Sequence, residues 1–143
     1  MSTATIQTSK GEMVFELYDN ETPITTQNFI KLSKEGFYDG LNFHRVLPNF
    51  VLQGGCPNGT GAGGPGYSID CETSAEKQHH ERGVLSMAHA GRNTGGSQFF
   101  VVINRDTTSH LDGVHTCFGK LTSGDEVIDL IEQGDKIDKI EIK

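Results

Sequence analysis

The sequence contains no tryptophan, only 4 prolines and only 3 cysteines among its 143 residues. It has no stretch of about 18 uncharged apolar residues, which a transmembrane helix requires. It also lacks the cluster of lysine and arginine that nucleic-acid-binding domains carry, and its formal net charge is −7. We therefore expect a protein that binds neither nucleic acid nor a membrane.

The cysteines do not suggest a disulfide framework. Cys56, Cys71 and Cys117 are odd in number, and none belongs to a C-x-x-C pair. This pattern is typical of proteins in a reducing compartment. Residues 1–10 are polar and lack the apolar core of a secretory signal. We therefore expect a cytoplasmic protein.

Glycine is abundant, with 18 residues, and this density is typical of many tight turns between short strands. The fractions of apolar and charged residues, 34% and 22%, are close to those of globular proteins. No repeat, charge block or linker divides the chain, and its length suits one folding unit. We expect a single domain over residues 1–143.

Two segments predict amphipathic helices, at residues 24–34 and 125–133, because apolar residues recur there at helical spacing. Each is followed by a glycine, Gly36 or Gly134, which suits a helix end. Thr22 is expected to cap the first helix, and Pro23 to be its first residue.

The rest of the chain predicts strands and turns. Strands are expected at 4–9, 12–18, 84–88, 99–103, 116–120 and around Ile140 and Ile142. The run at 99–103 is continuously apolar, which is typical of a strand that is covered on both faces or lines a closed barrel. These elements favour a mainly β fold, an antiparallel barrel with two helices outside it, because closure removes exposed strand edges.

Residues 59–64 match the G-x-G-x-x-G pattern of dinucleotide-binding proteins. That pattern needs a helix after its last glycine, whose N-terminus holds the pyrophosphate. Here Pro65 and Gly66 follow, and no helical periodicity is present. We interpret the segment as a flexible loop.

The histidines do not form a metal-binding pattern. His79 and His80 are adjacent and would point apart in a strand, while His110, His115 and Cys117 make an incomplete set of ligands. We therefore expect no metal and no other cofactor.

Three further groups are weak candidates for catalysis. Cys56 and Ser97 lie next to glycines, but no nucleophile motif and no neighbouring base accompany them. Asp70 and Glu72 are interpreted as a solvated strand face rather than an acid/base pair.

Residues 43–55 place one arginine and one glutamine among phenylalanines. Arg45 and Gln53 are separated by an even number of residues, so they would share a face if Pro48 and Asn49 did not interrupt the strand. Further along, Gln98 and Phe100 share a face of the apolar strand. The alternative is that Arg45 is a surface charge and the phenylalanines are core residues. The residues alone therefore indicate a barrel and leave two interpretations open: an Arg/Gln/Phe pocket, or a surface arginine beside core phenylalanines.

Several motifs resemble, in the same order, those of the cyclophilin family of peptidyl-prolyl cis/trans isomerases. They are FHRV at 43–46, QGG at 53–55, LSMA at 85–88, NTGGSQFF at 93–100, LDG at 111–113 and FG at 118–119. The resemblance covers nearly the whole chain. It implies a closed eight-stranded antiparallel barrel capped by two α-helices, and isomerisation of peptidyl-prolyl bonds without a cofactor.

The resemblance also implies the site. The family's catalytic arginine corresponds to Arg45. Its substrate-binding residues correspond to Phe50, Val51, Gln53, Ala88, His89, Ala90, Gln98, Phe100, His110, Leu111 and His115. We expect a monomer that acts on proline-containing polypeptides and assists their folding. The alternative is a module that binds proline peptides without catalysis.

The sequence departs from the family pattern at three positions. Many members carry tryptophan where His110 stands, and that tryptophan contributes to binding cyclosporin, so we expect weaker cyclosporin binding with catalysis largely retained. His89 replaces a common asparagine and Val51 a common methionine, and both changes are expected to be tolerated. The loop at 58–66 is expected to lie near the pocket.

Overall fold

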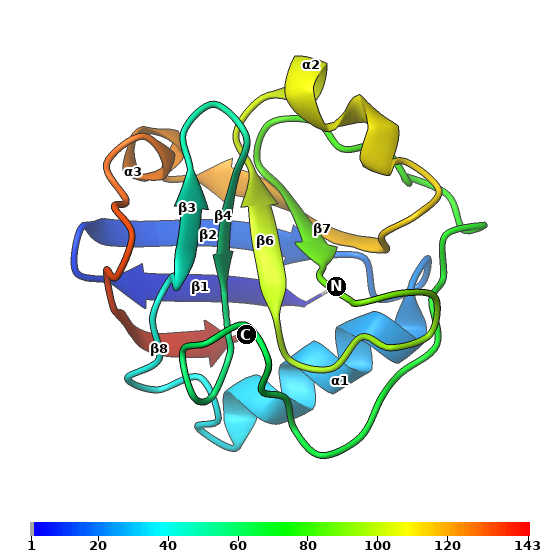
Figure 1. The fold of residues 1–143 in the computed structure, drawn as a ribbon, viewed down its shortest axis with the longest axis horizontal. Helices are drawn as coiled ribbons and strands as arrows, with labels where there is room; N and C mark the ends of the chain where they lie inside the picture. The colour runs from blue at the N-terminus through cyan, green and yellow to red at the C-terminus, as the bar shows by residue number, and fades with distance from the viewer. Residues whose placement is uncertain (1) are drawn as a thin grey trace.

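Eight strands form one antiparallel sheet that curls around the hydrophobic core (Figure 1). The structure is a computed structural model and describes residues 2–143. The strands are β1 (Thr3–Thr8), β2 (Gly11–Leu17), β3 (Arg45–Leu47), β4 (Val51–Gly54), β5 (Val84–Met87), β6 (Phe99–Val102), β7 (Cys117–Ser123) and β8 (Ile137–Ile142). Their order across the sheet is β3-β4-β6-β5-β7-β2-β1-β8. In Figure 1, β3, β4 and β6 run across the direction of β1, β2 and β8.

The inner face of the sheet holds the core. In β1 the buried residues alternate with partly exposed ones, whereas β5 and β6 are buried along their whole length. The continuous apolar run predicted to be a covered strand is therefore confirmed. Phe29 from the long helix packs against Phe99 and Phe118, with ring centroids 5.6 and 5.1 Å apart. Each fully buried ring of this kind stabilises the fold by roughly 1.5–3 kcal/mol.

The prediction of a closed barrel was wrong. In residues 2–143 no ladder joins the two edge strands, β3 and β8. The edges approach each other only along residues 40–43 and 134–137, which we call the seam. Four backbone hydrogen bonds of 2.7–2.9 Å and one isolated bridge between Asn42 and Lys136 hold it. The physical reason is length, because β3 has only three residues and begins beyond the seam.

The first predicted helix is confirmed as α1 (Pro23–Lys34), with Pro23 as its first residue. Its cap differs from the prediction, because Thr22 makes no side-chain capping bond. Instead, the backbone N–H groups of Ile24 and Thr25 donate to the Glu72 carboxylate, over 3.2 and 2.7 Å. Glu72 is thus the capping residue of α1 rather than part of a solvated strand face.

The second predicted helix is much shorter than expected. The structure has α3 at Asp125–Ile128, followed by turns. The carboxylate of Asp135 accepts the Glu132 N–H at 2.7 Å and pairs with Lys10 at 3.0 Å, which directs the chain toward β8 instead of along a helix. Leu130, part of the apolar pattern, is 51% exposed.

Two short helices were not predicted from the sequence: α2 (Arg105–Thr108) and the 3-10 helix η1 (Ser109–Leu111). The side chain of Asn104 caps α2 by accepting the Asp106 N–H at 2.9 Å. Together they carry the chain from β6 over one end of the sheet (Figure 1). None of the helices in residues 2–143 has the length and apolar character needed to cross a membrane.

β1 lies between β2 and β8, so an early strand of the chain pairs with the last described one. Ala4 is opposite Ile142, and Thr3 and Lys143 exchange two backbone hydrogen bonds of 2.9 Å. The first and last described segments are therefore neighbours.

Candidate active site

The β3–β4 hairpin places Arg45 at the mouth of a cleft. The chain turns at Pro48 and Asn49, where Asn49 takes a left-handed φ of 64° that asparagine tolerates better than most residues. The turn makes Arg45 and Gln53 directly opposite partners on adjacent strands, which places both on one face. The strand is interrupted at Pro48 and Asn49, so this shared face comes from pairing across the hairpin and not from even spacing within one strand. The exposed Arg45 guanidinium donates to the Gln53 side-chain oxygen at 3.3 Å.

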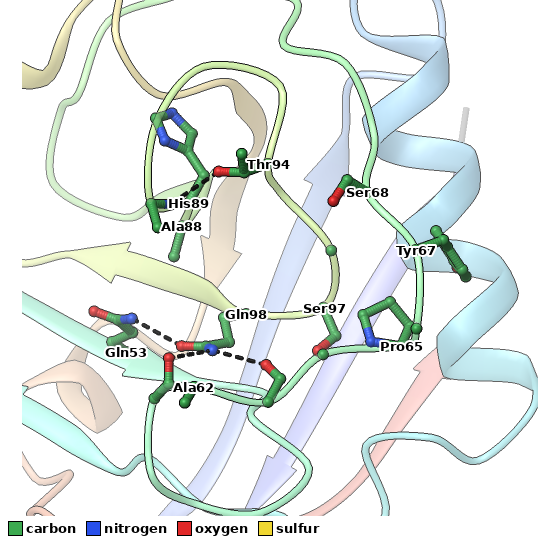
Figure 2. A pocket seen from close by; sticks show the side chains of 16 residues that line it. Gln53, Ala62, Pro65, Tyr67, Ser68, Ala88, His89, Thr94, Ser97 and Gln98 are labelled. Carbon is green, nitrogen blue, oxygen red and sulfur yellow. Dashed lines mark hydrogen bonds between the residues drawn. The ribbon is translucent and has the colours of Figure 1, made fainter.

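A chain of side-chain amides continues from this pair. The Gln53 amide nitrogen donates to the Gln98 oxygen at 3.1 Å, and the Gln98 nitrogen donates to two loop carbonyls. These carbonyls belong to Gly61 and Gly63, at 2.8 and 2.9 Å. Figure 2 shows the two glutamines end to end, with Gln98 reaching the loop around Ala62. Each amide therefore has a defined orientation.

A cleft of about 220 Å³ lies beside Arg45. Its walls are Arg45, Phe50, Val51, Gln53, Ala88, His89, Phe100, Leu111 and His115. The structure thus brings together the predicted catalytic residue and most of the residues predicted to bind substrate. No carboxylate lines the cleft, and Phe100, only 4% exposed, contributes one of its apolar surfaces. These properties suit an uncharged, compact ring.

A larger cavity of about 500 Å³ adjoins the cleft (Figure 2). It is lined by Gln53, residues 61–68, residues 88–90, Thr94 and residues 96–98. Two predicted substrate-binding residues, Ala90 and Gln98, lie here, and the loop at 58–66 borders it as expected. Sequence reasoning missed Tyr67, Ser68 and Thr94, because no local pattern marks them.

The remaining predicted residue, His110, lines neither cavity. It is exposed, and its ring stacks on that of Phe50, with centroids 6.1 Å apart and planes at 9°. His115 stacks on His89 at 4.1 Å and donates its Nδ1 hydrogen to the Met87 carbonyl at 2.9 Å. Burial lowers the pKa of His115 to about 4, so its ring is neutral near pH 7.

Behind Phe100 lies a buried polar network that sequence reasoning missed. The His80 ring is fully buried and stacks on Phe100 at 5.8 Å. Its Nδ1 pairs with the Asp112 carboxylate at 2.9 Å and its Nε2 with the Ser86 hydroxyl at 2.8 Å. Burial raises the pKa of Asp112, but hydrogen bonds from Arg105 and His80 hold it well below its usual range. Ser86 has no exposed surface, so this Asp-His-Ser arrangement supports the cleft and cannot attack a substrate.

The weaker sequence candidates have structural roles. The hydroxyl of Ser97 is buried and donates to the Gly55 carbonyl at 2.7 Å. Cys117, which the sequence offered only as part of an incomplete set of metal ligands, is buried, and burial raises the pKa of its thiol to about 12. Within residues 2–143, no three His, Cys, Asp or Glu side chains are grouped so that they could hold a metal ion. Residues 59–64 open no helix.

The fold and the cleft together define a protein with a curled antiparallel sheet and an apolar cleft bordered by one arginine. The comparisons with known proteins specify this class. A family model described as cyclophilin type peptidyl-prolyl cis-trans isomerase/CLD matches residues 3–143. The chain belongs to this family, and it is a peptidyl-prolyl cis-trans isomerase.

Individual relatives are similar over most of their length. Peptidyl-prolyl cis-trans isomerase B of Bacillus subtilis is 57% identical, over 93% of this chain and 92% of that protein. A peptidyl-prolyl cis-trans isomerase of Synechococcus elongatus is 53% identical, over 99% and 97%. The crystal structure of a Cryptosporidium parvum cyclophilin type isomerase has a TM-score of 0.90 and 34% identity, and covers 99% of this chain and 97% of that one. A second structure of that protein, in the presence of the dipeptide Ala-Pro, has a TM-score of 0.84 and 36% identity, and covers 98% and 96%.

Proposed function

We propose that Arg45 is the catalytic residue and that the substrates are proline-containing polypeptides, whose folding the enzyme assists. The observation that carries this proposal is the placement of the Arg45 guanidinium, held by Gln53 at the rim of an otherwise uncharged cleft. The structure of the Cryptosporidium relative in the presence of the dipeptide Ala-Pro supports this substrate class.

The reaction is a rotation about the X-Pro peptide bond, and catalysis requires stabilisation of its twisted transition state. The X-Pro peptide bond has partial double-bond character and a barrier of about 18–20 kcal/mol, so it isomerises in about 10–100 s unaided. In the twisted transition state the nitrogen lone pair is no longer delocalised into the carbonyl group. A guanidinium that donates to this lone pair stabilises the twisted state more than either planar isomer. Arg45 supplies that donor, and no covalent bond is broken.

The remaining walls position the peptide. Phe50, Val51, Phe100 and Leu111 hold the proline ring, with His115 and His110 at its border. Gln53, Gln98 and the backbone of residues 88–90 hold the chain on either side; the full set is Phe50, Val51, Gln53, Ala88, His89, Ala90, Gln98, Phe100, His110, Leu111 and His115. The apolar contacts select proline, and the amides set the direction of the peptide.

The required acceleration can be divided between these groups. Shortening about 100 s to about 10 ms is a factor of about 10⁴, or roughly 5–6 kcal/mol. One hydrogen bond from a charged donor contributes about 1.5–3 kcal/mol. Orientation and exclusion of water in the cleft supply the remainder. Arg45 therefore supplies a quarter to about half of the acceleration, and the walls of the cleft supply the rest.

A protease-coupled assay on an Ala-Pro peptide tests the proposal. We expect Arg45→Ala to lower kcat/KM by about 10–100-fold, because one charged hydrogen bond is lost. Arg92→Ala, which removes an exposed arginine outside the cleft, serves as the matched control and should be nearly unchanged. Equal activity of wild type and Arg45→Ala would overturn the assignment. Peptide binding without turnover in the wild type would favour the non-catalytic module, which the comparisons do not favour.

The proposal extends to the state of the enzyme in the cell. One copy of the chain contains every residue of the proposed site, so we infer that the enzyme acts as a single-domain monomer. We also infer that it works in the cytoplasm and needs no cofactor. Sedimentation equilibrium should then give a mass near 15.6 kDa at micromolar concentration. A dimer mass would contradict this part of the proposal and leave the catalytic part intact.

A further inference from the structure

Cys56 lies just after β4 at the base of the glycine-rich loop and is only 1% exposed. Its sulfur accepts the backbone N–H groups of Gly61 and Gly63, each at 3.3 Å, and its S–H group donates to the Asn58 side-chain oxygen at 3.0 Å. Burial raises the pKa of Cys56, but the N–H groups aimed at the sulfur outweigh it and lower that pKa. The loop is therefore wrapped around the sulfur atom.

The same two glycines hold the active-site amides on their other side. The carbonyls of Gly61 and Gly63 accept the Gln98 nitrogen, and Gln98 is followed by Gln53 and then Arg45. A continuous set of hydrogen bonds thus runs from the Cys56 sulfur to the guanidinium. Figure 2 shows its central part, between the loop and the two glutamines.

The direction of these hydrogen bonds decides which atom faces Arg45, because a side-chain amide has a donor end and an acceptor end. The two loop carbonyls fix the Gln98 nitrogen toward the loop, which leaves its oxygen for the Gln53 nitrogen. The Gln53 oxygen then faces Arg45. If Gln98 were reversed, Gln53 would present its own NH₂ group to the guanidinium, which accepts no hydrogen bond.

We propose that Cys56 is a positioning residue for catalysis: it shapes the loop whose carbonyls orient Gln98 and Gln53, and so aims Arg45. This inference rests on the proposed role of Arg45. It also explains the glycines that imitate a dinucleotide motif. Gly61 has a left-handed φ of +87°, and a Cβ at Gly63 would lie 2.9 Å from the Asn58 side-chain oxygen. The glycines allow the loop to close around sulfur.

The test is a double-mutant cycle on kcat. Cys56→Ala should lower kcat about fivefold and change KM less than about twofold. The orientation of the Arg45 guanidinium is lost, whereas the apolar cleft that binds the peptide is kept. In an Arg45→Ala background the same change should have no further effect. Cys56→Ser keeps a polar acceptor and should recover most of the activity. Cys71→Ala, at a half-buried thiol outside both cavities, is the matched control.

A second variant guards against misfolding at the buried site. Asn58 is exposed, and its oxygen also accepts the backbone N–H and hydroxyl of Thr60, so Asn58→Ala loosens the loop from outside the core. It should lower kcat in the same direction and show the same dependence on Arg45. Equal losses in both backgrounds, or unchanged kcat in both variants, would overturn the proposal.

A measurement independent of activity separates this inference from the proposed function. The ¹⁵N side-chain resonances of Gln98 and Gln53 should shift in Cys56→Ala and Asn58→Ala, and remain in place in Cys71→Ala. If the wild type proved inactive, the proposed function would fail while these shifts still reported the loop-to-glutamine connection. Unchanged Gln98 resonances in both loop variants would show that the connection does not exist.

Discussion

His115 links the cleft to the stability of the fold through its depressed pKa of about 4. In the unfolded chain a histidine has a pKa of about 6.5, so between about pH 6.5 and 4 the unfolded state binds the additional proton. The free energy of unfolding therefore falls as the pH falls through this window, and below about 4 the loss is complete. One such group accounts for up to about 3 kcal/mol.

We expect His115→Asn to reduce the loss of stability between pH 7 and pH 4.5. Urea unfolding at the two pH values, compared between wild type and variant, measures the difference. His79→Asn is the control, because the His79 side chain is 68% exposed. A variant with the same pH dependence as the wild type would show that His115 is not the titrating group.

His110 governs a second property, the response to cyclosporin. Its imidazole stacks on Phe50 from an exposed position. An indole in its place offers a larger face and an N–H donor, so His110→Trp should tighten cyclosporin binding by about tenfold. Because His110 lies at the border and is not a wall of either cavity, kcat/KM for a proline peptide should change less than about threefold. Titration calorimetry measures the affinity, and equal values for the two proteins would contradict the prediction.

Single residues differ in how far the sequence predicts them. The even spacing of Arg45 and Gln53 predicted a shared face only for an uninterrupted strand. The chain turns between them, and pairing across the hairpin places them on one face instead. His80 and Asp112 gave no such signal. They are 32 positions apart, in the loop before β5 and directly after η1, and the fold brings the His80 Nδ1 to 2.9 Å from the Asp112 carboxylate. Local patterns carry strand geometry, but they do not carry contacts between distant loops.

At the scale of elements, α1 owes its first turn to Glu72. We expect Glu72→Ala to lower the free energy of unfolding by about 1 kcal/mol, because two N–H groups lose their acceptor. Glu72→Gln keeps the acceptor oxygen without the charge, so its free energy of unfolding should lie between those of Glu72→Ala and the wild type. Chemical unfolding measures both, with the exposed Glu76→Ala as control. Equal stability of Glu72→Ala and wild type would mean that water replaces the cap without cost.

Hydrophobic periodicity predicted one of the two helices correctly and overestimated the length of the other. The pattern at 24–34 predicted α1 because Phe29 and Leu32 face the core. The pattern at 125–133 resembled it, yet Leu130 points to solvent and the chain turns after Ile128. Beyond the helix, the carboxylate of Asp135 pairs with Lys10, which lies on the β1–β2 turn. A contact so distant in sequence leaves no trace in a local window.

At the scale of the whole molecule, the seam is the least supported part of the sheet. Its backbone bonds belong to no ladder and have β1 only on the side of Ile137, whereas the bonds between β1 and β2 are flanked by strands on both sides. We expect the seam amides of Gly40, Phe43 and Gly134 to exchange with deuterium at least about tenfold faster than those inside β1. Native-state exchange followed by NMR measures this. Equal protection would show that the open sheet behaves as a closed one.

The position of β1 has a consequence for synthesis. The edge of β1 that faces away from β2 is paired only with β8, so Ala4 has no partner on that side until Ile142 is in place. While the chain is being made, the N-terminal hairpin can form early, but its exposed backbone groups have no partner until residues 137–142 leave the ribosome. An unpaired edge is open to pairing with other chains. This prolyl isomerase is thus synthesised with an unpaired strand edge, and nascent chains stalled before β8 should be its most aggregation-prone form.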